Sequence, residues 1–154
     1  MRLTQEEFAA VVRNTPLVSI DLVVRDPAGR VLLGVRRNEP AKGFWFVPGG
    51  RIAKDEPIAD AFRRLCRVEL NLDLTIEDGA FLGVYEHFYD TNFTQQGGFG
   101  THYVVLGYSI LLDEAPLDLP REQHERYRWF TVDEIRSDQR VHPHTRWYFA
   151  EGGG

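Results

Sequence analysis

The sequence predicts a single α/β domain in which helices pack against a mixed β-sheet. Segments with helical and strand character follow in the order helix, strands, central helix, strands and helix, which is typical of an α/β sandwich. The chain has 154 residues, 43% of them apolar, so it has the length of one domain and enough apolar side chains for a core. Internal repeats, low-complexity segments and linkers rich in Pro, Gly or Ser are absent, so we expect one domain over residues 1–154.

Composition argues against several classes of function. The formal net charge is −5 at pH 7, whereas general binders of nucleic acid or anionic membranes are usually basic. The single cysteine, Cys66, allows neither an intrachain disulfide nor a zinc site of cysteine pairs. The chain starts with polar and acidic residues, unlike a signal peptide, and its longest apolar run is too short for a membrane span. We therefore expect a cytoplasmic protein that binds a small molecule, not nucleic acid or membrane.

The first elements follow from capping and side-chain patterns. The run from Thr4 to Glu7 fits a capping box, which predicts a short N-terminal helix. Residues 17–24 are rich in aliphatic and β-branched side chains, and a Pro-Ala-Gly turn separates them from residues 31–35, so these two segments predict a hairpin. Residues 44–47 form a short aromatic run that ends at a Pro-Gly-Gly turn, and we expect a third strand there.

The second half of the chain predicts a central helix and further strands. Pro57 suits the first turn of a helix, and apolar side chains then recur at helical spacing, so we expect a helix over residues 57–70. The other predicted elements are strands over residues 81–89, 103–112 and 127–130, a short helix whose first residues are 132–135, and a final helix over 145–150.

One carboxylate lies on the apolar face of the central helix. At about 100° per residue, Ile58, Phe62, Leu65 and Leu72 share one face, and Glu69 falls on it too. A partly buried carboxylate must be ion-paired, hydrogen-bonded or bound to a metal. The spacing alone favours an ion pair with an arginine over metal ligation, and it leaves both open.

A set of residues at fixed spacing includes this glutamate. Gly50 is followed after five residues by Glu56, then after seven more by Arg64, and Glu69 lies five positions further on. The stretch resembles the Nudix box, and residues 44–50 resemble the strand and turn that lead into that box. The resemblance spans 23 positions, from 50 to 72, and implies a Nudix fold, an α/β/α sandwich around a mixed sheet.

The box departs from the family at three positions. Leu65, Val68 and Asn71 stand where the family has Glu, Glu and Gly. In the family, carboxylates on this helix face hold one or more Mg²⁺ ions against a diphosphate. Glu69 is the only acidic ligand left from that cluster, so we expect one Mg²⁺ that takes further oxygen ligands from elsewhere, with Mn²⁺ as a substitute.

This pattern of losses resembles one branch of the family, the GDP-mannose mannosyl hydrolases. The likeness extends to residues 14–19, 101–107, 122–124 and 127–129. It implies that Mg²⁺ is held by the backbone carbonyl of Gly49 and by the side chains of Glu69 and Gln123, and that His124 is the general base. It also implies catalytic roles on the diphosphate for Asp21, Arg36 and Arg51, and substrate-binding roles for Phe8, Tyr103, His87 and Arg64.

The implied reaction is chemically reasonable for these residues. A glycosidase protonates a poor leaving group, but a nucleoside diphosphate is a stable anion that Mg²⁺ and arginines can stabilise further. The attacking water then needs only a base, and a histidine with an ordinary pKa suits that role at neutral pH. Direct attack by one water at the anomeric carbon predicts inversion, so GDP-mannose, or GDP-glucose as a second candidate, would give GDP and the inverted free sugar.

Two other functions remain open from the sequence. One is an ordinary Nudix pyrophosphohydrolase that attacks phosphorus, and the other is a catalytically inactive sensor of a nucleotide sugar. The loss of two box glutamates argues against the first, and the presence of Glu69, Gln123 and His124 argues against the second. The branch also implies a homodimer in which the segment around Phe8 reaches the nucleotide site of the partner.

Overall fold

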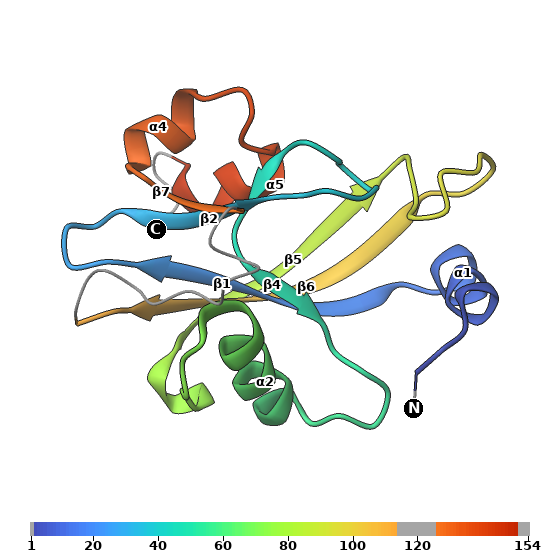
Figure 1. Ribbon diagram of the computed structural model, residues 1–154, viewed down its shortest axis with the longest axis horizontal. Helices are drawn as coiled ribbons and strands as arrows, with labels where there is room; N and C mark the ends of the chain where they lie inside the picture. The colour runs from blue at the N-terminus through green and yellow to red at the C-terminus, as the bar shows by residue number, and fades with distance from the viewer. Residues whose placement is uncertain (1, 114–125, 151–154) are drawn as a thin grey trace.

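The computed structural model describes residues 2–113 and 126–150 (Figure 1). A mixed sheet runs in the order β3-β2-β1-β6-β5, and β4 pairs with β1 while β7 pairs with β2. The strands are β1 (Leu17–Arg25), β2 (Val31–Val35), β3 (Trp45–Phe46), β4 (Gly49–Arg51), β5 (Ala80–Tyr89), β6 (Thr101–Leu111) and β7 (Tyr127–Phe130). The helices are α1 (Gln5–Asn14), α2 (Ile58–Leu70), α4 (Val132–Ser137) and α5 (Pro143–Arg146), with 3₁₀ turns η1 (Ile76–Asp78) and η2 (Trp147–Phe149).

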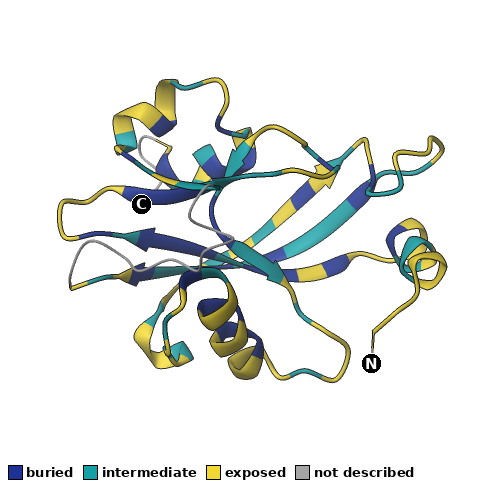
Figure 2. Ribbon diagram, in the orientation of Figure 1, coloured by how far each residue is buried: buried dark blue, intermediate teal, exposed yellow. Residues whose placement is uncertain are grey.

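The helices lie on both faces of the sheet, as the sequence predicts. Helix α2 lies below the sheet in Figure 1, and α4 and α5 lie above it. Alternate side chains of β1 enter two cores, because successive residues of a strand point to opposite faces. Ile20 and Leu22 pack with Phe62 of α2, whereas Val23 packs with Ile135 of α4. Figure 2 shows β1 as one of the most buried elements.

The sheet divides on one side of β1, and this division creates the site described below. Strand β6 runs parallel to β1 along its whole length, from Leu17 to Arg25. On the other side, β4 pairs with residues 19–21 of β1, and β2 pairs with β1 only at Arg25. Strands β2 and β4 therefore flank different ends of β1, and between them the carbonyl of Pro48 accepts a 2.8 Å hydrogen bond from the amide of Leu22.

Helix α2 begins and ends as the box predicts, with one informative exception. Pro57 precedes its first turn, and Asn71 ends it in the left-handed conformation with φ of 57°. Asparagine tolerates this conformation better than most residues that carry a Cβ, which explains how it can replace the glycine of the family pattern. The prediction that Ile58 lies on the buried face is wrong, since this first-turn side chain is 44% exposed.

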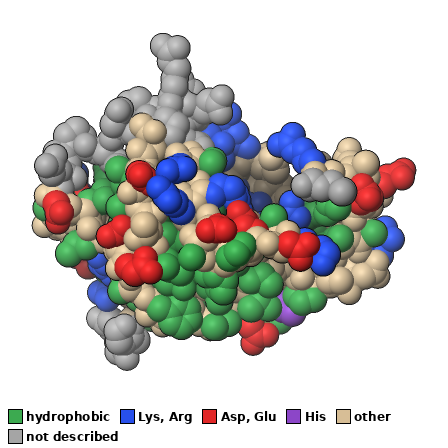
Figure 3. Space-filling model, turned by 90° about the horizontal axis from the view of Figure 1, so that it is seen from below, with side chains coloured by type: hydrophobic (Ala, Val, Ile, Leu, Met, Phe, Trp, Pro, Cys, Tyr) green, Lys and Arg blue, Asp and Glu red, His purple; other side chains and the backbone are tan. Residues whose placement is uncertain are grey.

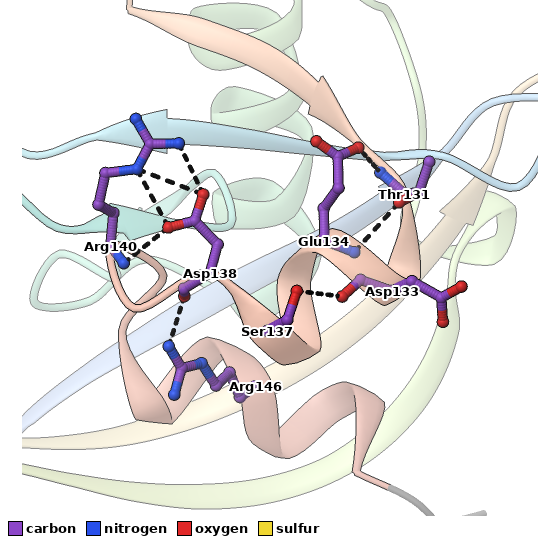
Figure 4. Close-up of polar contacts among 7 residues, drawn as sticks. All are labelled: Thr131, Asp133, Glu134, Ser137, Asp138, Arg140 and Arg146. Atoms are coloured by element: carbon purple, nitrogen blue, oxygen red, sulfur yellow. Dashed lines mark hydrogen bonds and ion pairs between the residues drawn. The ribbon is translucent and has the colours of Figure 1, made fainter.

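The predicted final helix begins earlier than expected. Helix α5 starts at Pro143, with His142 as its N-cap, and it tightens into η2 before residue 150. The hydrogen bonds in Figure 4 connect this region to α4. Asp138, which follows α4, pairs with Arg140 through its carboxylate and accepts a hydrogen bond from Arg146 at its carbonyl. These contacts fix α5 and η2 against the sheet, where they contribute to the site.

Other elements match the predictions with small differences. The capping box of α1 forms between Thr4 and Glu7, and the strand expected over 44–47 is only two residues long. Phe88 is 61% exposed. It lies on edge strand β5 with the exposed Val84, and Figure 3 shows hydrophobic side chains gathered on the face that carries α2. The homodimer stays a prediction.

None of the helices in the described part of the chain has the length and apolar character of a membrane span.

Candidate active site

A cavity of about 100 Å³ lies on the face of the sheet opposite α2, where β2 and β4 separate. Six of the residues that the sequence predicts for the site line it together: Asp21, Arg36, Gly49, Arg51, His87 and Tyr103. They come from four strands, β1, β4, β5 and β6, and the loop after β2. The fold therefore brings together residues that lie up to 82 positions apart in the chain, between 21 and 103.

The close approach of β4 to β1 requires glycine at position 49. Gly49 pairs with Asp21, and a Cβ on Gly49 would lie 2.2 Å from the carbonyl oxygen of Ile20. Such a distance is far below a van der Waals contact, so any larger residue would push the two strands apart. The glycine thus places the backbone of β4 directly beside the Asp21 carboxyl group.

Asp21 is held by a tyrosine that the sequence did not point to. The hydroxyl of Tyr148, in η2, donates a hydrogen bond of 2.8 Å to Asp21 Oδ2. Burial raises the pKa of Asp21 to about 7, although the Tyr148 hydrogen bond and the positive charge of Arg36 both oppose that rise. At neutral pH this carboxyl group can therefore either accept or donate a hydrogen bond. The only sequence signal for Tyr148 is Gly107, where a Cβ would lie 2.9 Å from its ring.

A second cavity of about 100 Å³ adjoins the first and contains the box glutamate. The two share Arg36 and Gly49, and Glu69, Arg126 and Tyr127 line the second. The Tyr127 hydroxyl donates a 2.5 Å hydrogen bond to Glu69 Oε2. Burial and the negative charge of Glu69 both raise the pKa of Tyr127, so this hydroxyl keeps its proton at neutral pH.

Glycine 34 makes room for this tyrosine. A Cβ on Gly34 of β2 would lie 2.2 Å from the ring of Tyr127 on β7, and these two residues are paired in the sheet. Sequence reasoning identified neither Tyr127 nor Arg126 as a site residue. A glycine inside a strand can mark such a close approach, but it does not say which side chain approaches.

The oxygen donors in the second cavity suit a hard cation. Glu69 and Gly49 both line it, while Gln123, the third predicted ligand, lies outside the described residues. Within residues 2–113 and 126–150, no three His, Cys, Asp or Glu side chains form a group that could hold a metal ion. From the described residues a cation here would have the Glu69 carboxylate and the Gly49 backbone, and phosphate and water oxygens could complete the usual surrounding of Mg²⁺.

The side chains that stand in place of the two box glutamates, Leu65 and Val68, cannot act as metal ligands. Leu65 is 3% exposed and belongs to the core between α2 and the sheet, whereas Val68 is 53% exposed. Glu69 lies between these two environments and is half-buried. The described part of α2 therefore offers one carboxylate to the cavity, as the sequence predicts.

Arg51 connects the cavity to two other predicted residues. Its guanidinium lies 4.1 Å from the ring centre of Phe8 in the same chain. Arg64 donates one hydrogen bond of 2.9 Å to the Arg51 carbonyl and forms an ion pair with Glu56 at 2.8 Å, and this pair lowers the pKa of Glu56. Arg64 thus fixes the loop between β4 and α2, and it does not line either cavity.

Three histidines form a buried cluster behind the cavity. His87 of β5 lines the cavity and stacks on His144 of α5, with ring centres 4.2 Å apart, and His142 lies 4.4 Å from His144. Burial lowers their pKa values, to about 3 for His87 and about 4 for the other two, so all three are neutral at pH 7. Among the described residues His87 Nε2 is buried and has no hydrogen-bond partner.

This cluster makes stability depend on pH in a definite direction. Because the folded pKa values lie below 6.5, the unfolded chain binds more protons than the folded chain at acidic pH. As the pH is lowered from about 6.5 to about 4, the free energy of unfolding should therefore fall by up to about 1.4 kcal/mol per pH unit for each histidine. Asp21, with its raised pKa, opposes this trend in the same range. Urea unfolding at several pH values should give a shallower slope for His144→Gln than for the wild type, and equal slopes would contradict this expectation.

The comparisons with known proteins agree with the fold and the box. A family model described as the NUDIX domain matches residues 15–150, and the chain belongs to the NUDIX family of hydrolases. It is 45% identical over 129 residues to the low-salt glycan biosynthesis protein Agl8 of Haloferax volcanii, a match that covers 84% of this chain and 80% of that protein.

Solved structures show the same architecture. A MutT NUDIX hydrolase from Burkholderia pseudomallei superposes with a TM-score of 0.69 at 27% identity, over 88% of this chain and 97% of that chain. The NUDIX domain of Shewanella oneidensis NrtR, crystallised with ADP ribose, gives a TM-score of 0.62 at 18% identity, over 94% of each chain. The second likeness shows a shared fold. Nudix hydrolases generally use divalent cations such as Mg²⁺.

Two predicted residues cannot be placed. Gln123 and His124 lie in the segment 114–125, outside the described residues. The described chain resumes at Arg126, which lines the Glu69 cavity.

Proposed function

We propose that this protein is a Mg²⁺-dependent hydrolase of GDP-mannose, with GDP-glucose as a second substrate. Water attacks the anomeric carbon with inversion, and GDP and the free sugar are the products. The 45% identity to a protein named for glycan biosynthesis supports a nucleotide sugar as the substrate. The branch resemblance in the sequence supports GDP-mannose in particular.

The observation that carries this proposal is the single box carboxylate. Glu69 faces a cavity together with Gly49, while Leu65 is buried in the core and Val68 is turned outward. Several metal ions held between box glutamates would suit attack on phosphorus. One cation beside the diphosphate is enough to stabilise a leaving group when water attacks carbon instead.

Different residues around the first cavity bind the two halves of the substrate, the diphosphate and the sugar. Arg36, Arg51 and Tyr103 provide donors for the diphosphate oxygens. Asp21 and His87 provide polar groups suited to sugar hydroxyls, since one has a pKa near 7 and the other is a neutral imidazole. These groups fix the orientation of the anomeric carbon relative to the attacking water.

The reaction then needs a base and a stabilised leaving group. When bound by Glu69, Gly49 and Gln123, Mg²⁺ would neutralise charge that develops on the diphosphate. His124 takes a proton from the attacking water as its oxygen bonds to the anomeric carbon, and the bond from that carbon to the β-phosphate oxygen breaks. Arg36 and Arg51 stabilise the departing GDP, so no general acid is required.

The position of a heavy oxygen label tests the proposal directly. GDP-mannose is incubated with the protein and Mg²⁺ in ¹⁸O-water, the label is located by mass spectrometry, and the sugar anomer is read by proton NMR. We expect the label on free mannose, GDP as the other product, and the β anomer formed first from the α-linked substrate.

Two outcomes would overturn the proposal. Label on phosphate, with GMP and mannose 1-phosphate as products, would mean ordinary Nudix attack on phosphorus. Tight binding of GDP-mannose without turnover, unchanged in His124→Gln, would mean a sensor of nucleotide sugars.

A further inference from the structure

Three arginines line the two cavities without a carboxylate partner among the described residues. Arg36 lines both cavities, Arg51 the first, and Arg126 the second. No described carboxylate lies within ion-pair distance of any of them, whereas six other basic residues of the described chain form ion pairs: Arg30, Lys54, Arg63, Arg64, Arg67 and Arg140. A cluster of positive charges in a cleft favours an anionic ligand.

Arg36 and Arg126 are held side by side by the sheet. Strands β2 and β7 are antiparallel, with Gly34 opposite Tyr127. The ladder continues one residue further, because the amide of Val35 donates a 3.0 Å hydrogen bond to the carbonyl of Arg126. Arg36 follows Val35 directly, so both arginines lie at the same end of this strand pair, where they line the Glu69 cavity.

Both side chains carry a buried donor that has no described partner. The Nε atoms of Arg36 and Arg126 are buried and have no hydrogen-bond partner among the described residues. A buried N–H of a charged group without a partner is costly, and native proteins normally provide one. Two such donors beside a single cavity therefore indicate a ligand with several acceptor oxygens.

The cavity selects the kind of anion. Its volume of about 100 Å³ is small, which suits a phosphate group. Guanidinium groups bind phosphate through two parallel N–H donors, a geometry that lysine lacks. Tyr127 is held in its neutral form there, so a phosphate meets no second anion beyond Glu69, which a divalent cation can bridge.

We propose that Arg126, together with Arg36, forms a clamp that binds a phosphate of the diphosphate in the Glu69 cavity. Arg126 is thus a further substrate-binding residue. It contacts the diphosphate from the β7 side, while Arg51 and Tyr103 contact it from the first cavity. The clamp depends on the proposed function in one respect only, namely that the diphosphate it binds is part of a nucleotide sugar.

Inorganic pyrophosphate is the probe that tests the clamp apart from hydrolysis. Its affinity is measured by isothermal titration calorimetry on the full chain with Mg²⁺, for the wild type and for Arg126→Gln, Arg126→Lys and Arg128→Gln. Arg128 is the matched control, because it lies two residues further on, in β7, but is exposed and stacks on Trp45 and Phe130 instead of lining a cavity. Unfolding midpoints of all four proteins establish that each is folded.

The expected pattern separates the role of Arg126 from a general loss of charge. Arg126→Gln should weaken pyrophosphate binding about 10- to 100-fold, the usual effect of losing hydrogen bonds to a charged group. Arg126→Lys should recover only part of that loss, since it restores charge without the Nε donor. Arg128→Gln should stay within about twofold of the wild type, as expected for an exposed charge.

Two results would overturn the clamp. One is pyrophosphate affinity in Arg126→Gln that matches Arg128→Gln, and the other is full recovery in Arg126→Lys, which would leave the Nε donor without a role. GDP-mannose turnover is measured on the same samples. Hydrolysis with unchanged pyrophosphate affinity refutes the clamp alone, and weakened affinity without any hydrolysis refutes the proposed function alone.

Discussion

Glu69→Gln is expected to lower kcat for nucleotide-sugar hydrolysis by more than about 100-fold and to raise the Mg²⁺ concentration needed for half-maximal activity. Replacement of a group that only orients a metal ligand commonly costs about 10- to 100-fold, so loss of the carboxylate ligand itself should cost more. Removal of divalent cations with a chelator should abolish activity in the wild type, and added Mg²⁺ should restore it.

The substitution is conservative in shape, which makes the result interpretable. Glutamine keeps an oxygen that can accept the hydrogen bond from Tyr127, now 2.5 Å from Glu69 Oε2. Glu86→Gln provides the control, because it removes the same charge from an exposed position on β5 that lines neither cavity. A Mg²⁺ titration followed by initial rates measures both effects. Activity in Glu69→Gln equal to that of Glu86→Gln would exclude Glu69 as a ligand.

The sequence predicts the scaffold of the site better than its interior. Apolar spacing locates α2, and the box spacing selects Gly50, Glu56, Arg64 and Glu69, because these depend on local backbone geometry. The six predicted residues that line the first cavity come from the resemblance, which carries information about distant contacts that periodicity lacks. The structure adds what holds them, such as the Tyr148 hydrogen bond to Asp21.

The residues that sequence reasoning missed share a physical cause. Tyr127, Arg126 and His144 lie on elements whose own patterns are ordinary, and their roles arise from pairing across the sheet or packing on it. The pair His142 and His144 resembles a surface loop in sequence, yet it is half-buried or buried beside His87. Burial of this kind depends on where α5 packs against the sheet, and local sequence does not encode that position.

The second large effect is expected from Gly49→Ala, which should lower the free energy of unfolding by about 3 kcal/mol. The added methyl group would lie 2.2 Å from the Ile20 carbonyl oxygen and 3.2 Å from the Cα of Asp21. Both neighbours are backbone atoms of β1, so no side-chain rotation can relieve the overlap, and overpacking of this kind typically costs about 1–3 kcal/mol or more. Separation of β4 from β1 should also displace Asp21 and the Gly49 carbonyl, so kcat should fall even at temperatures where the variant is fully folded.

Gly97→Ala provides the matched control, because no atom lies within 4 Å of the position that its Cβ would occupy. It should change the free energy of unfolding by less than about 0.5 kcal/mol, as surface substitutions usually do. Urea unfolding of both variants and the wild type measures the difference, and GDP-mannose turnover below the unfolding transition measures the effect on the site. If the two variants were equally stable, β4 would be free to move away from β1, and the close approach would not be what fixes Gly49 beside Asp21. If Gly49→Ala were destabilised but kept the wild-type kcat, the strand pairing would serve stability and not the alignment of the cavity.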